Sequence, residues 1–246
     1  MIGFFPKPYV DELAYSVFAR YFERSGYTCF ASCSEDLYVN PKNKPSIEFF
    51  NLLTNDAINH IVPLVGSIEN FILNHTMFNY YSTFLSNSNR HQAFEYALSM
   101  DIKALMNSLP IPKSKTSRYL RYCPLCVIED RELYGETYWH RAHQVFGVNV
   151  CYKHECYLID SKVSISSNAS PSLIKAESEI ESWSIISKAL PKEIDLARYN
   201  IEILNHNYSS NVLYNDLSDS EREWKDADKL QAIIMDLLKG EENEEE

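Results

Sequence analysis

The chain has 246 residues, of which 45% are hydrophobic and 13% aromatic, a composition typical of a folded globular protein. Its six glycines and ten prolines are too few for a disordered chain or for one dominated by strands and turns. No run of about 18 apolar residues occurs, which predicts no membrane span, and the N-terminus lacks the pattern of a signal peptide. We therefore expect a cytoplasmic protein, in which paired cysteines are metal ligands more often than disulfides.

Charge divides the sequence into two parts. The formal net charge is −11, but residues 1–169 contribute −1 and residues 170–246 contribute −10. Binding of a polyanion such as DNA is therefore compatible with the first two thirds of the chain and unfavourable for the last third.

The first predicted element is an amphipathic helix within residues 8–24. Asp11 is a good N-cap, and Glu12 places a negative charge in the first turn, where it suits the helix dipole. Apolar side chains recur every fourth residue and predict a face that is buried against other helices: Leu13, Val17 and Tyr21.

Residues 46–109 have the pattern of several short helices followed by a longer one. The expected N-caps of the short helices are, in order, Ser46, Asp56 and Ser67. The last stretch, residues 89–109, has helical apolar periodicity throughout and ends before Pro110. Short helices with tight connections suit a helix-turn-helix, but no glycine turn identifies one, so a simple helical bundle is an equal alternative.

A boundary is predicted at Pro110-Ile-Pro112, so that residues 1–112 form an N-terminal helical domain. The stretch that follows has four basic and no acidic side chains: Lys113, Lys115, Arg118 and Arg121. Clustered cations neutralise phosphates, and the tyrosines among them can stack or hydrogen-bond there. A DNA-contacting strip and a solvated linker are equally compatible with this pattern.

Two pairs of soft ligands come next, each with two residues between its members: Cys123 and Cys126, then Cys151 and His154. Zinc favours four tetrahedral thiolate or imidazole ligands, and a two-residue gap lets both members of a pair face one ion. The spacing predicts one structural zinc ion in a module over residues 113–160. The alternative, four buried core residues, explains neither the pairing nor the Cys-Pro-x-Cys turn. Cys156 follows closely and could replace one ligand.

The segment between the two pairs contains Trp139-His140-Arg141-Ala142-His143. On a helix, His140 and His143 would share a face and could bind a second metal, as in a metal-dependent nuclease. No carboxylate lies between them, so we favour polar contacts for both, with Trp139 packed over the zinc and Arg141 as a candidate phosphate contact. No glycine-rich phosphate loop, nucleophile elbow or acidic strand-transfer triad occurs, which indicates a binding module in preference to an enzyme.

Beyond this module the sequence becomes polar and then acidic. Residues 161–172 are rich in serine and asparagine and predict a loop, residues 173–239 predict helices, and residues 241–246 predict a disordered acidic end. The whole pattern predicts a mainly α fold in three parts: an N-terminal helical domain (1–112), a small zinc-finger module with its preceding basic strip (113–160), and an acidic helical segment with its tail (161–246).

Three blocks of the sequence stand in a fixed order. They are Phe5-Pro-x-Pro-Tyr-x-x-Glu-Leu-x-Tyr-Ser16, then His75-Thr-Met-Phe-x-x-Tyr81, then a long block that starts at Arg121-Tyr-Cys-Pro-Leu-Cys126. The long block continues through Trp139-His-Arg-x-x-Gln144 to Gly147-Val-x-Val-Cys-x-x-His154. In order and spacing, these blocks resemble the TniQ/TnsD family, the target-site selection proteins of heteromeric cut-and-paste transposons.

The resemblance implies a non-enzymatic bacterial adaptor in DNA transposition. TnsD-like members recognise a chromosomal attachment sequence, TniQ-like members couple to an RNA-guided effector complex, and both recruit an AAA+ ATPase regulator. The resemblance also implies helix-turn-helix elements in the N-terminal part. It implies that the zinc ligands are Cys123, Cys126, Cys151 and His154. It places the ATPase contact in the first block, at Pro6, Tyr9, Glu12, Leu13 and Tyr15.

Longer relatives carry a second zinc motif and a large C-terminal DNA-reading part. Because no cysteine follows Cys156 here, we expect either a short family member or the N-terminal portion of a longer protein. The acidic last third argues against sequence-specific DNA reading by this chain alone. Two alternatives to the adaptor stay open: a metal-dependent nuclease that uses His140 and His143, and a zinc-finger transcription regulator. The sequence does not determine the oligomeric state.

Overall fold

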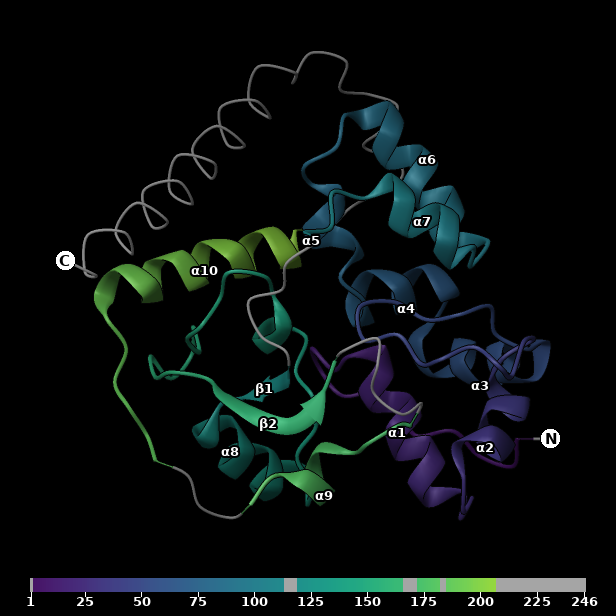
Figure 1. The fold of residues 1–246 in the computed structure, drawn as a ribbon, viewed down its shortest axis with the longest axis horizontal. Helices are drawn as coiled ribbons and strands as arrows, with labels where there is room; N and C mark the ends of the chain where they lie inside the picture. Colours follow the sequence, from purple (N-terminus) through teal and green to yellow (C-terminus); the bar gives the residue numbers. More distant parts are fainter. Residues whose placement is uncertain (1, 113–118, 166–171, 182–184, 207–246) are drawn as a thin grey trace. The chain divides into compact units, whose positions relative to one another are not determined.

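The computed structural model describes residues 2–112, 119–165, 172–181 and 185–206, and this part of the chain is mainly helical, as predicted (Figure 1). Its α-helices are α1 (Ala14–Arg24), α2 (Phe30–Leu37), α3 (Asn55–Val65), α4 (Ile68–His75), α5 (Phe78–Ser82), α6 (Asn87–Leu98), α7 (Ile102–Ser108), α8 (Pro124–Tyr134), α9 (Ala176–Glu179) and α10 (Pro191–Asn205). It also contains the short 3-10 helix η1 (Ala142–Gln144) and the strands β1 (Tyr119–Tyr122) and β2 (Ile159–Ser164). No helix in this part is long and apolar enough to cross a membrane.

Helix α1 is buried on almost every side. Leu13, Val17 and Tyr21, the stripe predicted from the sequence, are at most 2% exposed. The N-cap of α1 is Leu13, which makes no side-chain capping bond. The expectation that Asp11 caps this helix is wrong: its backbone has a positive φ of 57°, and its carboxylate accepts a hydrogen bond from Ala142 N at 3.0 Å instead.

The N-terminal part contains the predicted succession of short helices, with different boundaries. Ser67 caps α4 as predicted, through a 3.1 Å hydrogen bond to the first turn of that helix. The N-cap of α3 is Thr54, and Asp56 lies inside the helix. Residues 47–53 are not helical, so Ser46 caps no helix.

Residues 89–109, predicted as one helix, belong to two helices, α6 and α7. The chain turns between them at Met100, whose φ of 54° lies in the left-handed region. Helix α7 has its own N-cap, Asp101, whose side chain accepts a hydrogen bond from Ala104 N at 3.0 Å. Continuous apolar periodicity therefore concealed a break that contains no glycine.

Strands β1 and β2 form an antiparallel pair in a part of the sequence for which no strand was predicted (Figure 1). Arg121 pairs with Asp160, and Tyr122 pairs with Ile159. The predicted loop over residues 161–172 is therefore partly a strand. The pairing brings the two cysteine-bearing segments together, because β1 ends directly before Cys123 and β2 begins shortly after Cys156.

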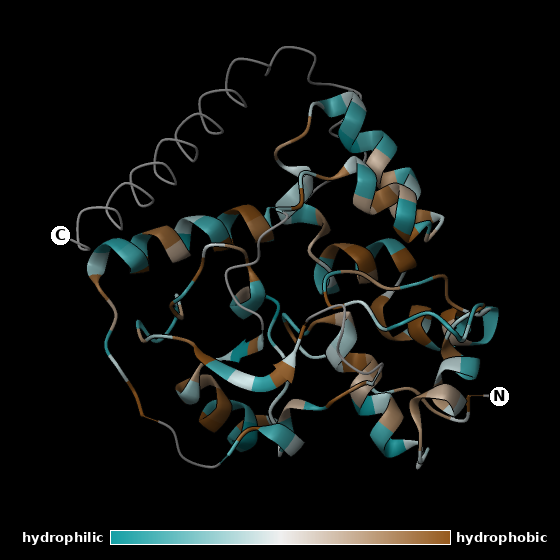
Figure 2. Cartoon of the chain, viewed as in Figure 1, coloured by the Kyte–Doolittle hydropathy of each residue, from teal (hydrophilic) through white to brown (hydrophobic). Residues whose placement is uncertain are grey.

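Aromatic rings form the core around α1. Phe18 packs edge-on against Tyr38, Phe50 and Phe71, with ring centroids between 5.9 and 6.1 Å apart, a favourable arrangement for aromatic pairs. Helix α10 closes another side of the core. Figure 2 shows hydrophobic and hydrophilic positions alternating along it, and its buried apolar side chains are Ile194, Ala197, Ile201 and Leu204.

All described residues belong to one compact unit. Within it, Leu13 N donates a hydrogen bond to Trp139 O at 3.0 Å, so α1 contacts the segment between the two cysteine pairs directly. The division of the chain at residues 112 and 160 stays a prediction. Helices α9 and α10 lie within the predicted helical stretch 173–239. The rest of that stretch beyond residue 206, and the acidic end at 241–246, lie outside the described residues.

Candidate metal centre

The two predicted ligand pairs lie on turns beside regular elements. Strand β1 leads directly into Cys123, the N-cap of α8, whose Sγ accepts a 3.5 Å hydrogen bond from Cys126 N. Pro124 occupies the first position of α8, where a missing backbone N–H costs nothing. Cys151 and His154 belong to the tight turn that precedes β2. Local turn geometry therefore directs both members of each pair to one point.

The donor atoms of these four residues all lie within 4.8 Å of one another. The sulfurs of Cys126 and Cys151 are 3.8 Å apart, and His154 Nδ1 lies 3.4, 3.3 and 3.6 Å from the sulfurs of Cys123, Cys126 and Cys151. Tetrahedral zinc with ordinary bond lengths requires about 3.8 Å between sulfurs and about 3.5 Å between sulfur and nitrogen. The spacing therefore fits a metal ion. Within the described ranges, no other group of three or more such donors comes this close together.

A carboxylate outside the four donors contacts His154. Glu129 Oε1 lies 3.1 Å from His154 Nε2, the ring nitrogen that faces away from the sulfurs. The other oxygen of Glu129 pairs with Lys153, and hydrogen bonds from Lys153 and then His154 lower the pKa of the carboxyl. Metal-binding histidines commonly use such a partner to fix the orientation of the ring. Glu129 was not predicted as a site residue, although it lies only three residues after Cys126.

Cys156 lies beside the donors. Its sulfur is 3.5 Å from that of Cys123. The group of donor atoms that all lie within 4.8 Å of one another consists of Cys123, Cys126, Cys151 and His154 and does not include Cys156. The geometry therefore favours the four predicted residues as candidate donors, with Cys156 as their neighbour.

His140 and His143 have protein partners. His140 Nε2 lies 2.9 Å from Asp130 Oδ2. Burial opposes the charge on His140, but the hydrogen bond to Asp130 and the charges of Asp130 and Asp11 outweigh it, and the pKa of His140 is raised. His143 Nε2 lies 3.6 Å from Cys126 Sγ. The two rings are 4.7 Å apart, but no third donor joins them in the described part of the chain. This geometry does not favour the nuclease alternative.

Trp139 is fully buried against α1. Its backbone N–H donates to Ser16 Oγ at 3.1 Å, and its indole Nε1 donates to Ile174 O at 2.8 Å. The partly buried apolar side chains that pack on the cysteine cluster are those of Leu125 and Leu158. The structure therefore places Trp139 beside α1, and not over the candidate metal as expected.

Arg121 and Arg141 are buried, at 6% and 4% exposure, so neither guanidinium lies on a surface that DNA could contact. Arg121 Nη2 donates to Val145 O at 3.0 Å. Arg141 Nη1 donates to Leu73 O at 2.6 Å, and its Nε donates to Asp11 Oδ1 at 3.1 Å. This placement corrects the expectation of phosphate contacts, because both arginines bind the chain's own oxygens. The other predicted DNA contacts lie outside the described residues: Lys113, Lys115 and Arg118.

The N-terminal block folds into the interior. Of the residues expected to contact a partner protein, Tyr9 is half-buried and the rest are buried: Pro6, Glu12, Leu13 and Tyr15. Arg20 forms buried ion pairs with Glu12 at 2.8 Å and with Glu136 at 2.9 Å. The predicted contact residues are thus mostly core residues, whereas Val10 in the same block is 79% exposed.

Two comparisons with known proteins agree with the resemblance seen in the sequence blocks. A family model described as TniQ matches residues 3–158, a span that includes all four candidate donors. The Transposon Tn7 transposition protein TnsD of Escherichia coli is 28% identical over 155 residues, which are 61% of this chain and 30% of that relative. The matched part therefore spans less than a third of the relative's length.

Proposed function

The chain belongs to the TniQ family, and on this premise we propose that it is a zinc-containing adaptor that selects the target site in DNA transposition. The observation that carries the proposal is the family match over residues 3–158. The same span contains the four candidate metal donors, and the relative that matches over 155 residues is named a transposition protein. As an adaptor, the chain would bind and position other molecules and catalyse no reaction itself.

We propose zinc as the metal, with one structural ion per chain. Three thiolates and one imidazole are a common donor set of structural zinc sites, and four protein donors leave no open position for water or substrate. When bound, the ion supplies folding free energy and joins the turn before α8 to the turn before β2. The residues that would hold it are Cys123, Cys126, Cys151 and His154.

We propose that the first two thirds of the chain recognise DNA or a targeting complex on DNA. The net charge of this part is −1 and does not oppose a polyanion, whereas the last third is strongly acidic. The short helices α3 to α7 are the proposed place of the helix-turn-helix elements. The target would be an attachment sequence if the chain is TnsD-like and an RNA-guided effector complex if it is TniQ-like. The phosphate contacts proposed here are those of Lys113, Lys115 and Arg118.

Replacing these three cations with glutamine tests the DNA contact. The slope of log K against log salt is negative, and each lost phosphate contact makes it less steep by about 0.9. The triple variant should therefore make the slope less steep by about 2.7. The measurement is fluorescence anisotropy with duplex DNA at several salt concentrations. The control variant replaces three exposed lysines outside helices α3 to α7: Lys42, Lys188 and Lys192. An unchanged slope in the first variant, or an equal loss in the control, would remove the basic strip from the interface.

The second proposed partner is an AAA+ ATPase regulator that contacts the N-terminal block. Because Glu12 and Leu13 are buried, we place the contact on exposed side chains at the start of the block, where Phe4, the residue directly before it, is 41% exposed. Phe4→Ala should weaken co-purification of the ATPase. Leu52→Ala, at a residue of similar exposure outside the block, should leave it unchanged. Equal recovery of the ATPase with both variants would argue against this surface.

A transposition assay tests the function as a whole. The other proteins of the transposon are supplied with and without this chain, and the insertion positions are sequenced. Insertions should concentrate at a preferred target when the chain is present, and Cys123→Ser should abolish that concentration. The same distribution with and without the chain would contradict a role in target selection.

A further inference from the structure

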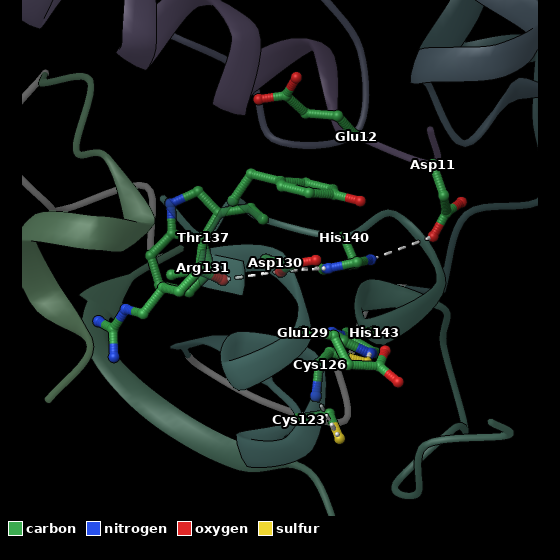
Figure 3. Close-up of polar contacts among 12 residues, drawn as sticks. Asp11, Glu12, Cys123, Cys126, Glu129, Asp130, Arg131, Thr137, His140 and His143 are labelled. Atoms are coloured by element: carbon green, nitrogen blue, oxygen red, sulfur yellow. Dashed lines mark hydrogen bonds and ion pairs between the residues drawn. The ribbon is translucent and has the colours of Figure 1, made fainter. Parts of the chain in front are cut away.

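A cavity of about 310 Å³ lies between the segment that precedes α1 and helix α8. Figure 3 shows its polar residues converging from different parts of the chain: Asp11 from the N-terminal segment, Glu129 and Asp130 from α8, and His140 and His143 from the segment that includes η1. The proposed function gives this cavity no role.

Aromatic rings form one wall of the cavity. Tyr138 stacks on His140 with ring centroids 4.1 Å apart, and His140 lies 4.7 Å from His143. Tyr134 and Tyr152, which are both partly exposed, also line the cavity. Among these rings, the faces of the tyrosines attract cations, most strongly where water is excluded. One face of Tyr138 lies against His140 and one face of Tyr134 against Tyr9, so the attraction belongs to their other faces and to Tyr152. A cationic ligand would therefore gain more from this wall than an uncharged ligand of the same size.

Three carboxylates line the cavity together with one ammonium group, that of Lys153: they belong to Asp11, Glu129 and Asp130. Lys153 pairs with Glu129, and Arg141, which is not part of the lining, pairs with Asp11. The two hydrogen bonds that Asp130 accepts from described side chains, at 2.9 Å each, use Oδ2. The Oδ1 atom of Asp130 therefore has acceptor capacity left. Each of the three carboxylates has a basic partner, namely Arg141 for Asp11, Lys153 for Glu129 and His140, whose pKa is raised, for Asp130, so the preference for a ligand rests on the free acceptor atoms and not on net charge.

A buried imidazole nitrogen in the same lining has no partner. His143 is 3% exposed, and its Nε2 lies 3.6 Å from Cys126 Sγ, so Nδ1 is an acceptor when Nε2 carries the proton. Nδ1 has no hydrogen-bond partner among the described residues, an unfavourable condition for a buried polar atom. Asp130 Oδ1 and His143 Nδ1 can thus each accept a further hydrogen bond. A ligand with several N–H groups would donate to both atoms.

Exposed apolar side chains border the cavity. Val10, before α1, is 79% exposed, and Leu133, on α8, is 72% exposed. A free inorganic cation or a small amine would leave both side chains in water, whereas a protein segment can cover them. The free acceptors of Asp130 and His143 and the apolar border together favour a protein segment in which a side chain with several N–H groups lies between apolar ones.

We propose that this cavity binds an arginine side chain of a partner protein, with the residues on either side of the arginine packed on Val10 and Leu133. A guanidinium is planar and stacks on aromatic rings, and its five N–H groups reach acceptors in several directions. A lysine ammonium is compact and strongly hydrated. It has three N–H donors and no planar group that could stack on the rings. The proposal goes beyond target selection and does not depend on DNA binding.

Titration of the full, zinc-loaded chain with two short peptides tests the proposal. The probe is acetyl-Leu-Arg-Leu-amide, and its control carries citrulline, which has the shape of arginine without the charge. Binding is followed by backbone amide chemical shifts in nuclear magnetic resonance. We expect saturable shifts at Leu133, Tyr134 and Tyr152, and at least about tenfold weaker binding of the citrulline peptide, because charge-assisted hydrogen bonds are the strong ones.

A matched pair of variants on α8 completes the experiment. Leu133→Lys places a competing ammonium group at the border of the cavity and should weaken binding of the arginine peptide about tenfold. Ile128→Lys adds the same charge at a 48% exposed residue outside the lining and should leave binding unchanged. Equal binding of the two peptides, equal effects of the two variants, or no saturable shift at the three amides would overturn the proposal.

Discussion

Glu129 contacts the ring nitrogen of His154 that faces away from the three sulfurs, at a distance of 3.1 Å. Loss of such a partner weakens metal binding about 10- to 100-fold. Glutamine keeps the size and one acceptor oxygen but loses the charge, so we expect Glu129→Gln to weaken zinc binding about tenfold, the lower end of that range. The measurement is competition for zinc with a chromophoric chelator at neutral pH.

Glu132→Gln is the control for this prediction, because Glu132 is exposed on the same helix and the substitution removes the same charge. It should leave the affinity for zinc unchanged. If both variants bind zinc as the wild type does, Glu129 does not position His154.

Glu12 makes the stability of the fold depend on pH. Burial raises its pKa to about 7, although Arg20, 2.8 Å away, acts in the opposite direction. A carboxyl group whose pKa is higher in the folded state takes up a proton on folding. Its contribution to stability is fully present below the unfolded pKa of 4.5 and is lost as the pH rises through 7. Between these values the slope approaches ~1.4 kcal/mol per pH unit.

Urea denaturation of the zinc-saturated chain at several pH values checks this dependence. Relative to Glu12→Gln, which cannot ionise, the wild type should lose free energy of unfolding as the pH rises from acid to neutral. Glu35→Gln, at an exposed residue, should follow the wild type. Parallel curves for the wild type and Glu12→Gln would refute the assignment.

The donor residues were predictable because each ligand pair is local in the sequence. The partners of the buried charges were not. Arg20 and Glu136 are 116 residues apart and form a 2.9 Å ion pair, and no periodicity or spacing connects them. For the same reason, Arg121 and Arg141 resembled surface cations in the sequence, whereas distant carbonyl and carboxylate oxygens hold them in the interior.

At the scale of elements, two N-caps support a prediction. Thr54 and Ser67 each accept a hydrogen bond from the first turn of their helix, at 3.1 Å. Thr54→Ala and Ser67→Ala should each lower the free energy of unfolding by ~1 kcal/mol, because a helix N–H loses its partner. Ser88→Ala, at an exposed residue inside α6, should have almost no effect. Chemical denaturation measures all three, and an equal effect of Ser88→Ala would contradict the capping roles.

Elements with local signals were predicted, and those that depend on tertiary contacts were not. The cap of α4 and the buried stripe of α1 follow from residue type and spacing. Strands β1 and β2 are short and pair across about 40 residues, so neither carries a signal of its own. The break at Met100 requires a left-handed backbone at a residue type that rarely adopts one, so no glycine marks it in the sequence. Backbone hydrogen bonds close the end of α6 there: Met100 N donates to Ala97 O at 3.1 Å and Asp101 N donates to Tyr96 O at 3.0 Å.

At the scale of the whole molecule, buried polar contacts join α1 to the cysteine-bearing part of the chain. Leu13 N donates to Trp139 O at 3.0 Å, and Trp139 N donates to Ser16 Oγ at 3.1 Å. Arg20 on α1 pairs with Glu136, just after α8. These contacts are buried, and buried polar groups are costly to separate from their partners. The stability of α1 should therefore depend on that of the cysteine-bearing part.

We therefore expect that removal of zinc destabilises α1 together with the cysteine-bearing part. Structural zinc contributes folding free energy on the order of 10 kcal/mol, so Cys123→Ser should lose protection against hydrogen–deuterium exchange in α8 and in α1 alike. Cys29→Ser is the control, because Cys29 is exposed and lies outside the donor set, and it should keep both zinc and protection. If α8 loses its protection while α1 keeps it, the two parts fold independently, as the predicted boundary at residue 112 would require.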